Sequence, residues 1–128
     1  SIITTKSPKS LSGAPGFKQW EGTGINAKTL IFSGNAQQAI KLFPANVNIA
    51  ATISLSGLGP EKTKVLVYAD PKSKINIHVI SIKSKAGKYK FKFENLPSSE
   101  NPKTSLLAIL SALQTIRKIN GNYLEIGS

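Results

Sequence analysis

Short runs of β-branched and aromatic residues, separated by glycine, proline and polar residues, recur along the first three quarters of the chain. Runs of this composition and length are typical of strands. They predict strands at residues 2–5, 29–32, 65–69, 75–82 and 89–93. Residues 85–87 separate the last two runs so closely that they predict an antiparallel hairpin. Residues 7–24 are rich in glycine and proline and predict a loop.

Apolar residues at helical spacing predict the helices. Asn35 is a good helix cap, and the apolar positions after it share one face of a helix over residues 36–43. Small and β-branched residues predict a buried helix over residues 46–58. A longer periodic pattern predicts a helix over residues 102–119, followed by a short strand at 123–126. Together these elements predict an α+β fold, in which helices cover one side of a mostly antiparallel, mixed sheet.

Composition supports one globular domain. The chain has 128 residues, of which 40% are hydrophobic and 18% charged. It contains no cysteine, which excludes a disulfide framework, and it shows no cluster of metal ligands. It has neither an apolar run of about 20 residues nor a secretory signal, so we expect no membrane partner and a cytoplasmic location. Methionine is absent even from position 1, which predicts a trimmed chain or a piece of a longer protein.

The formal charge of +11 favours anionic partners, whether nucleic acid or a small anionic substrate. Between Lys88 and Lys92 the lysines alternate with Tyr89, Phe91 and Phe93. This alternation is typical of a half-buried strand with its aromatic rings in the core and its lysines in water. A surface on which bases stack against the same rings is the alternative interpretation.

His78 is the only histidine, and no other side chain has an ordinary pKa so close to neutrality. It lies in the run 75–82, where alternation places it on the same strand face as Asn76 and Ile80. A lone histidine in an apolar strand is more often a hydrogen-bonded structural residue than a catalyst. If the chain transfers protons near pH 7, however, His78 is the first candidate. The sequence Gly22-Thr23-Gly24 lacks the third glycine of a dinucleotide fingerprint.

Four groups of residues occur in the order that one family shows. They are Phe32-Ser33-Gly34-Asn35-Ala36 with 42–51, Asp70-Pro71 with Asn76-Ile77-His78, Glu94-Asn95 with 100–105, and 124–127. In this order and at this spacing they resemble the L-aspartate dehydrogenases. The resemblance runs from about residue 32 to the end of the chain, and residues 4–6 and 12–15 agree more loosely.

The resemblance implies that residues 1–128 are the C-terminal substrate and oligomerisation domain of a two-domain enzyme. The N-terminal Rossmann domain, which binds NAD or NADP, is missing from this chain. The implied reaction oxidises L-aspartate through iminoaspartate towards oxaloacetate and ammonia, with a link to NAD biosynthesis. The resemblance also implies a homodimer, and the isolated chain is expected to be inactive.

The family's catalytic acid/base falls on His78, and its cofactor-contacting asparagine falls on Asn48. The starts of the predicted helices, near Asn35 and Pro102, could offer backbone N–H groups to substrate carboxylates, with Lys103 and Thr104 as further substrate-binding residues, although a capped, solvated helix start explains that pair at least as well. Two alternatives remain: a related dehydrogenase of another small acid, and a basic module that binds nucleic acid. The resemblance disfavours nucleic acid as a partner.

Overall fold

The computed structural model describes residues 1–97. The helix predicted over 102–119 and the strand predicted at 123–126 lie outside the described residues, as do Lys103 and Thr104.

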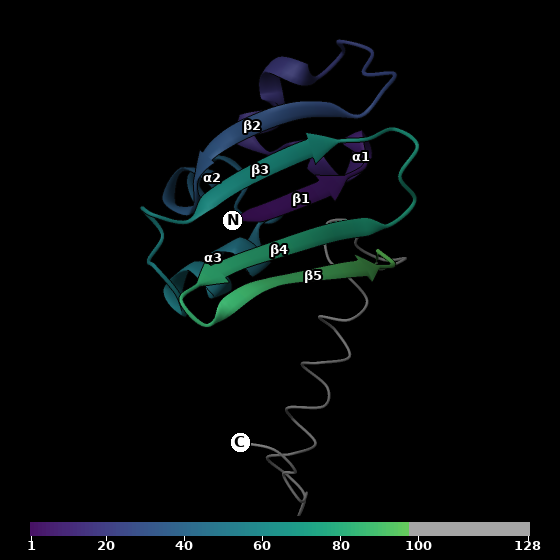
Figure 1. Ribbon diagram of the computed structural model, residues 1–128. Coiled ribbons are helices and arrows are strands. Elements are labelled where there is room, and N and C mark those ends of the chain that lie inside the picture. The colour runs from purple at the N-terminus through teal and green to yellow at the C-terminus, as the bar shows by residue number, and fades with distance from the viewer. Residues whose placement is uncertain (98–128) are drawn as a thin grey trace, which may run out of the picture.

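One five-stranded sheet organises the described chain (Figure 1). Its strands are β1 (Ile2–Lys6), β2 (Thr29–Asn35), β3 (Lys64–Ala69), β4 (Asn76–Ser84) and β5 (Gly87–Asn95), in the order β2-β3-β1-β4-β5. Only β1 and β3 pair in parallel, and the other three neighbouring pairs are antiparallel. The predicted mixed, mostly antiparallel sheet and its final hairpin are therefore confirmed.

In the view of Figure 1, α1 (Pro8–Leu11), α2 (Ala36–Leu42) and α3 (Asn48–Leu55) lie behind the sheet, and the 3-10 helix η1 (Pro15–Trp20) lies beyond the edge strand β2. The predicted loop over 7–24 was thus partly wrong, because Pro8 and Pro15 each stand in the first turn of a short helix, where proline is tolerated. The helix predicted over 46–58 is shorter than expected, and Leu55 at its end is exposed, so it is buried on one side only.

The start of α2 explains how the chain turns from β2 into the helical layer. The Asn35 side chain accepts a hydrogen bond from the Gln38 backbone N–H at 2.9 Å, and the Gln38 side chain accepts one from the Asn35 N–H at 3.1 Å. This reciprocal capping box satisfies two N–H groups that a helix start otherwise leaves unpaired. It confirms Asn35 as the predicted cap.

The hydrophobic core fills the space between the sheet and the helices. Its fully buried members include Ile2 from β1 and Val65 and Val67 from β3. Phe43, which follows α2, is also fully buried and meets the Phe32 ring edge-on, with ring centroids 5.7 Å apart. The core therefore joins β2, β3 and β1 to the helical layer.

Strand β4 has its more polar face turned towards the helices. Asn76, His78 and Ile80 are buried there, whereas the apolar Ile77 and Val79 on the opposite face remain half-buried. The grouping predicted from alternation is confirmed, and the structure adds that the face bearing the histidine is the inner one.

The aromatic residues of β5 share this inner face, because Phe93, Phe91 and Tyr89 lie directly opposite His78, Ile80 and Ile82. The three rings are nevertheless 39–47% exposed, so the prediction that they lie in the core was wrong for the described residues. The rings occupy an edge strand. Within residues 1–97, β5 contacts β4 extensively but makes no comparable contact with any described helix. Alternation assigned their face correctly but carried no information about what covers it.

We expect Gly16→Ala to destabilise the chain. A Cβ at this position would lie 2.5 Å from the Phe43 ring and 2.9 Å from Leu42 Cβ. Such overpacking of a well-filled core typically costs about 1–3 kcal/mol. The free energy of unfolding from urea titration is the measurement.

The matched background for this substitution is Phe43→Leu, which removes the ring that the new methyl group would meet. Gly16→Ala should cost less in that background than in the wild-type chain, because residues in contact are energetically coupled. Strictly additive costs would contradict the steric explanation.

Candidate functional site

His78 lies near the middle of the sheet, directly opposite Thr4 in the antiparallel pairing of β1 and β4. Its Nδ1 atom is 3.1 Å from the Thr4 hydroxyl oxygen, and both side chains are buried. This hydrogen bond occupies one ring nitrogen and leaves Nε2 as the nitrogen that can exchange a proton with another molecule. A histidine with a purely structural role would make such a hydrogen bond. A catalytic imidazole also needs the fixed orientation that this bond provides.

Lys6 is the second titratable residue of this site, and sequence reasoning missed it. It follows Thr4 by two positions on β1, so its side chain lies on the same inner face. It is buried, and its Nζ donates a hydrogen bond to Asn46 Oδ1 at 3.3 Å. Burial lowers the pKa of the Lys6 ammonium to about 8. The sequence did contain a signal for Lys6: alternation along this apolar strand places the lysine side chain on the same face as Thr4.

The electrostatic environment keeps the imidazole of His78 neutral at pH 7. Burial, and to a smaller extent the positive charge of Lys6, lowers the pKa of His78 to about 4. The cause is physical: a protonated ring would lose hydration and would face a like charge. In this neutral state Nε2 carries a lone pair that can accept a proton, and the lowered pKa makes the ring a weaker base than an exposed imidazole.

Asn48 is the first residue of α3, and its side chain is exposed. It follows Asn46 by two positions. Because Asn46 accepts the hydrogen bond from Lys6, the chain just before α3 lies at the Lys6 side chain. Within residues 1–97, no hydrogen bond joins Asn48 to His78 directly. The structure therefore leaves the Asn48 amide exposed at the start of α3, and its predicted role stays a prediction. The predicted roles of Lys103 and Thr104 fall outside the described residues.

The described part of the chain contains no group of three or more histidine, cysteine, aspartate and glutamate side chains able to hold a metal ion. Within the same part, no helix is long and apolar enough to span a membrane.

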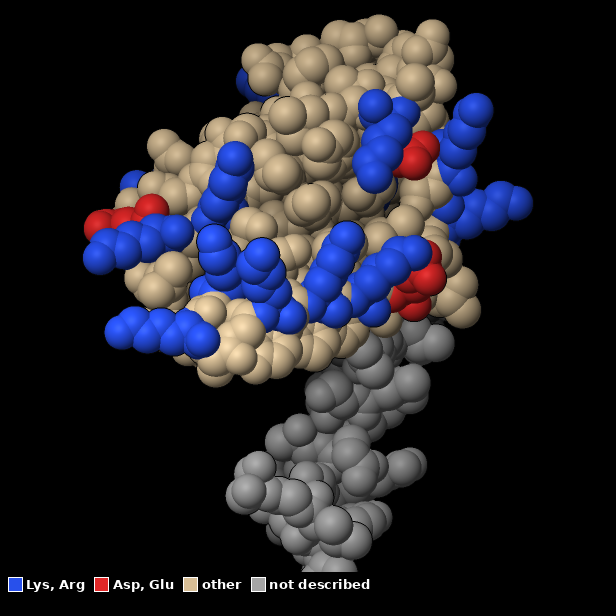
Figure 2. All heavy atoms as spheres, in the orientation of Figure 1, with Lys and Arg blue, Asp and Glu red and all other residues tan. Residues whose placement is uncertain are grey.

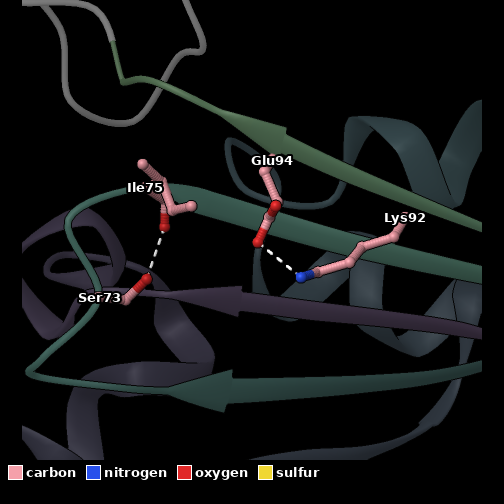
Figure 3. A network of polar contacts seen from close by, with 4 residues as sticks. All are labelled: Ser73, Ile75, Lys92 and Glu94. Carbon is pink, nitrogen blue, oxygen red and sulfur yellow. Dashed lines mark hydrogen bonds and ion pairs between the residues drawn. The ribbon is translucent and has the colours of Figure 1, made fainter.

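The other face of the sheet carries no described helix (Figure 1). Figure 2 shows this open face, with lysine side chains gathered along its lower part, over β5. The ion pair between Lys92 Nζ and Glu94, at 2.6 Å, lies along that strand (Figure 3). Because Phe91 and Phe93 lie on the inner face, the lysines and the aromatic rings of β5 do not form one surface. The structure therefore does not favour the nucleic-acid alternative, which needs rings and cations side by side.

Comparisons with known proteins identify the family. The family described as "Aspartate dehydrogenase, C-terminal" matches residues 1–119. The chain belongs to this family. It is 47% identical to the L-aspartate dehydrogenase of Nitrosopumilus maritimus, over 100% of this chain and 48% of that protein. It is 52% identical to the L-aspartate dehydrogenase of Methanosarcina barkeri, over 92% of this chain and 44% of that protein.

A solved structure agrees with the fold. The crystal structure of aspartate dehydrogenase from Thermotoga maritima matches with a TM-score of 0.67 and 38% identity, over 98% of this chain and 45% of that one. The predicted α+β fold and the predicted family are therefore confirmed. The chain spans about half the length of the relatives that it matches. The assignment of residues 1–128 to one C-terminal domain, and the roles of individual residues, stay predictions.

We expect the stability of the chain to fall as the pH falls from 7 to 5. In the unfolded chain His78 takes up its proton near pH 6.5, but in the folded chain only near pH 4. Between these values the unfolded state binds more protons, so acid favours unfolding. The expected loss by pH 5 is about 2 kcal/mol, measured as the free energy of unfolding in urea.

His78→Asn is the control, because asparagine is polar but does not titrate. His78 is the only histidine, so this variant should lose most of the pH dependence between pH 7 and pH 5. An equal slope in both proteins would show that His78 is not the group responsible.

Proposed function

We propose that this chain is the C-terminal half of an NAD(P)-dependent L-aspartate dehydrogenase and that His78 is its acid/base residue. The observation that carries the proposal is the buried, neutral imidazole of His78, held at Nδ1 by Thr4, in a chain that belongs to the aspartate dehydrogenase C-terminal family. A cytoplasmic location is part of the proposal and rests on sequence composition alone.

The proposed reaction needs two proton steps. L-aspartate and NAD(P)⁺ become iminoaspartate, NAD(P)H and a proton, after which water adds to the imine and ammonia leaves to give oxaloacetate. His78 Nε2 accepts the proton from the substrate ammonium, which frees the nitrogen lone pair. His78 releases that proton to solvent, after which it takes a proton from the attacking water and passes it to the departing amine.

NAD or NADP, when bound, supplies the acceptor for the hydride that leaves the substrate Cα. The described residues fit such a partner, because Asn48 offers an exposed side-chain amide at the start of α3, two positions after the Asn46 that binds Lys6. An amide can donate to and accept from a carboxamide, and a fixed amide of this kind orients a reacting ring. The sequence lacks the glycine-rich fingerprint of a dinucleotide site, so we expect the chain to be inactive without its own N-terminal Rossmann domain.

Removal of the imidazole should abolish most of the activity. In the enzyme completed by its Rossmann domain, we expect His78→Asn to lower kcat for L-aspartate-dependent NAD(P)H formation by about 100-fold or more. Absorbance at 340 nm follows the reaction. Circular dichroism should show that the variant remains folded.

Thr4 offers matched variants for the same assay. Thr4→Val removes the hydroxyl that holds Nδ1 and should lower kcat, whereas Thr4→Ser keeps the hydroxyl and should retain most of it. Full activity of His78→Asn would overturn the assignment of His78. Activity with another small amino acid, but none with L-aspartate, would favour the related dehydrogenase instead.

We further propose that a second copy of the chain covers the open face of the sheet. Leu66, Tyr68, Ile77 and Val79 contribute apolar side chains to that face and are only half-buried. An apolar sheet face without helices is typical of an interface rather than a solvated surface.

The test is the mass of the particle in solution. Analytical ultracentrifugation should find a dimer for the wild-type chain and a monomer for Leu66→Asp, because burying a carboxylate at the interface is costly. Leu58→Asp is the matched control: Leu58 lies beyond α3, outside the open face, and is 77% exposed. It should leave the dimer intact. Loss of the dimer in both variants, or in neither, would contradict this interface.

A further inference from the structure

A small cavity lies at the beginning of β4, where its lining includes Asn76, two positions before His78. Its volume is about 230 Å³, below the roughly 300–1,000 Å³ typical of sites for drug-sized ligands. The polar residues that line it come from the start of α1 and from the turn before β4: Ser7, Lys9, Ser10, Ser73, Lys74 and Asn76. A cavity of this size suits one functional group of a small molecule.

Asn76 is the feature that points to a ligand. It lines the cavity and is only 2% exposed, yet within residues 1–97 its Nδ2 atom has no hydrogen-bond partner. Leaving a buried donor unsatisfied costs about 1–3 kcal/mol, so buried polar groups without a partner are rare. An acceptor bound in the cavity would satisfy this amide.

The neighbouring hydroxyls provide a further donor. Ser7 and Ser10 share one hydrogen bond, with their oxygens 3.0 Å apart, so only one of their two hydroxyl protons is used in it. Ser73 differs, because its hydroxyl already donates to the Ile75 carbonyl at 2.7 Å and holds the turn before β4 (Figure 3). The cavity therefore presents amide and hydroxyl donors on a fixed frame.

The positive charge of the residues that line the cavity favours an anionic ligand. Lys9 and Lys74 line it, and no carboxylate does. Thr5 pairs with Ile77, so the next residues along the two strands, Lys6 and Asn76, lie at the same end of the inner face. Amide and hydroxyl donors beside ammonium groups are the partners that a carboxylate prefers.

The position of the cavity relates it to the proposed chemistry. Asn76 and His78 share the inner face of β4, and residues two apart on a strand are separated by roughly 7 Å. A short dicarboxylate that contacts Asn76 with one end can therefore place its reacting carbon next to the imidazole.

We propose that this cavity binds the side-chain carboxylate of a four-carbon amino dicarboxylate, and that Asn76, Ser7 or Ser10, Lys9 and Lys74 select that substrate. The proposal rests on the proposed function, since it assigns a specificity site to the same reaction. Asn76 is a binding residue and takes no part in proton transfer.

The first test separates binding from chemistry in the enzyme completed by its Rossmann domain. Asn76→Ala should raise KM for L-aspartate by about 10-fold or more, with kcat changed much less, because a hydrogen bond to a charged group is lost. Asn76→Ala should also reduce the preference for L-aspartate over L-asparagine.

Lys9→Gln and Lys74→Gln change exposed side chains, so they keep the test valid if Asn76→Ala fails to fold. Each should raise KM several-fold, whereas Lys62→Gln, an exposed lysine that does not line the cavity, should not. An unchanged KM in both cavity lysine variants would overturn the proposal.

The second test needs no catalysis. Succinate should shift the side-chain amide signal of Asn76 in the NMR spectrum of the chain, and succinamide, in which neutral amides replace the carboxylates, should shift it much less. An equal response to sulfate, or no response to succinate, would overturn the proposed selectivity. If succinate binds here but the complete enzyme does not oxidise L-aspartate, the proposed function fails while the carboxylate site stands.

Discussion

The hydrogen bond between Thr4 and His78 is the contact on which the candidate site depends. It joins the adjacent strands β1 and β4 from within their inner face, where both side chains are buried. Breaking it would leave buried polar atoms unsatisfied, at a cost of about 1–3 kcal/mol. The imidazole therefore has one favoured orientation, and the other polar residues of this face are arranged beside it.

The sheet separates two kinds of surface because successive side chains on a strand point to opposite sides. On the inner side, β1 and β4 carry Thr4, Lys6, Asn76 and His78 beside the apolar core. On the open side, apolar residues are bordered by the lysines of β5 (Figure 2). The inner face thus carries the candidate site, and the open face is the one at which we propose that a second copy binds.

The positive charge of Lys6 links the two parts of the inner face. It helps to keep His78 neutral, and it lies at the end of β1 next to the cavity at Asn76. A carboxylate bound there would offset that charge and raise the pKa of His78 back towards its ordinary value. Substrate binding would then bring the imidazole closer to the range in which it can both accept and donate a proton at neutral pH.

The sequence by itself determined most of the local structure. Runs of β-branched and aromatic residues identified the five strands of residues 1–97, alternation placed His78 with Asn76 on one face, and the capping residue Asn35 located the start of α2. These features depend on neighbours in sequence, so a pattern of residues carries them. The four groups of family residues also pointed to the family that the comparisons confirm.

Only the tertiary structure decided which face of the sheet is covered and which side chains meet across it. The partners Thr4 and His78 are separated by 74 positions, and Lys6 and Asn46 by 40. Local patterns carry no record of such pairings, because they follow from the order of the strands and the path of the loops. The exposed rings of β5 show the same limit, since alternation assigns a side chain to a face but not to a neighbour.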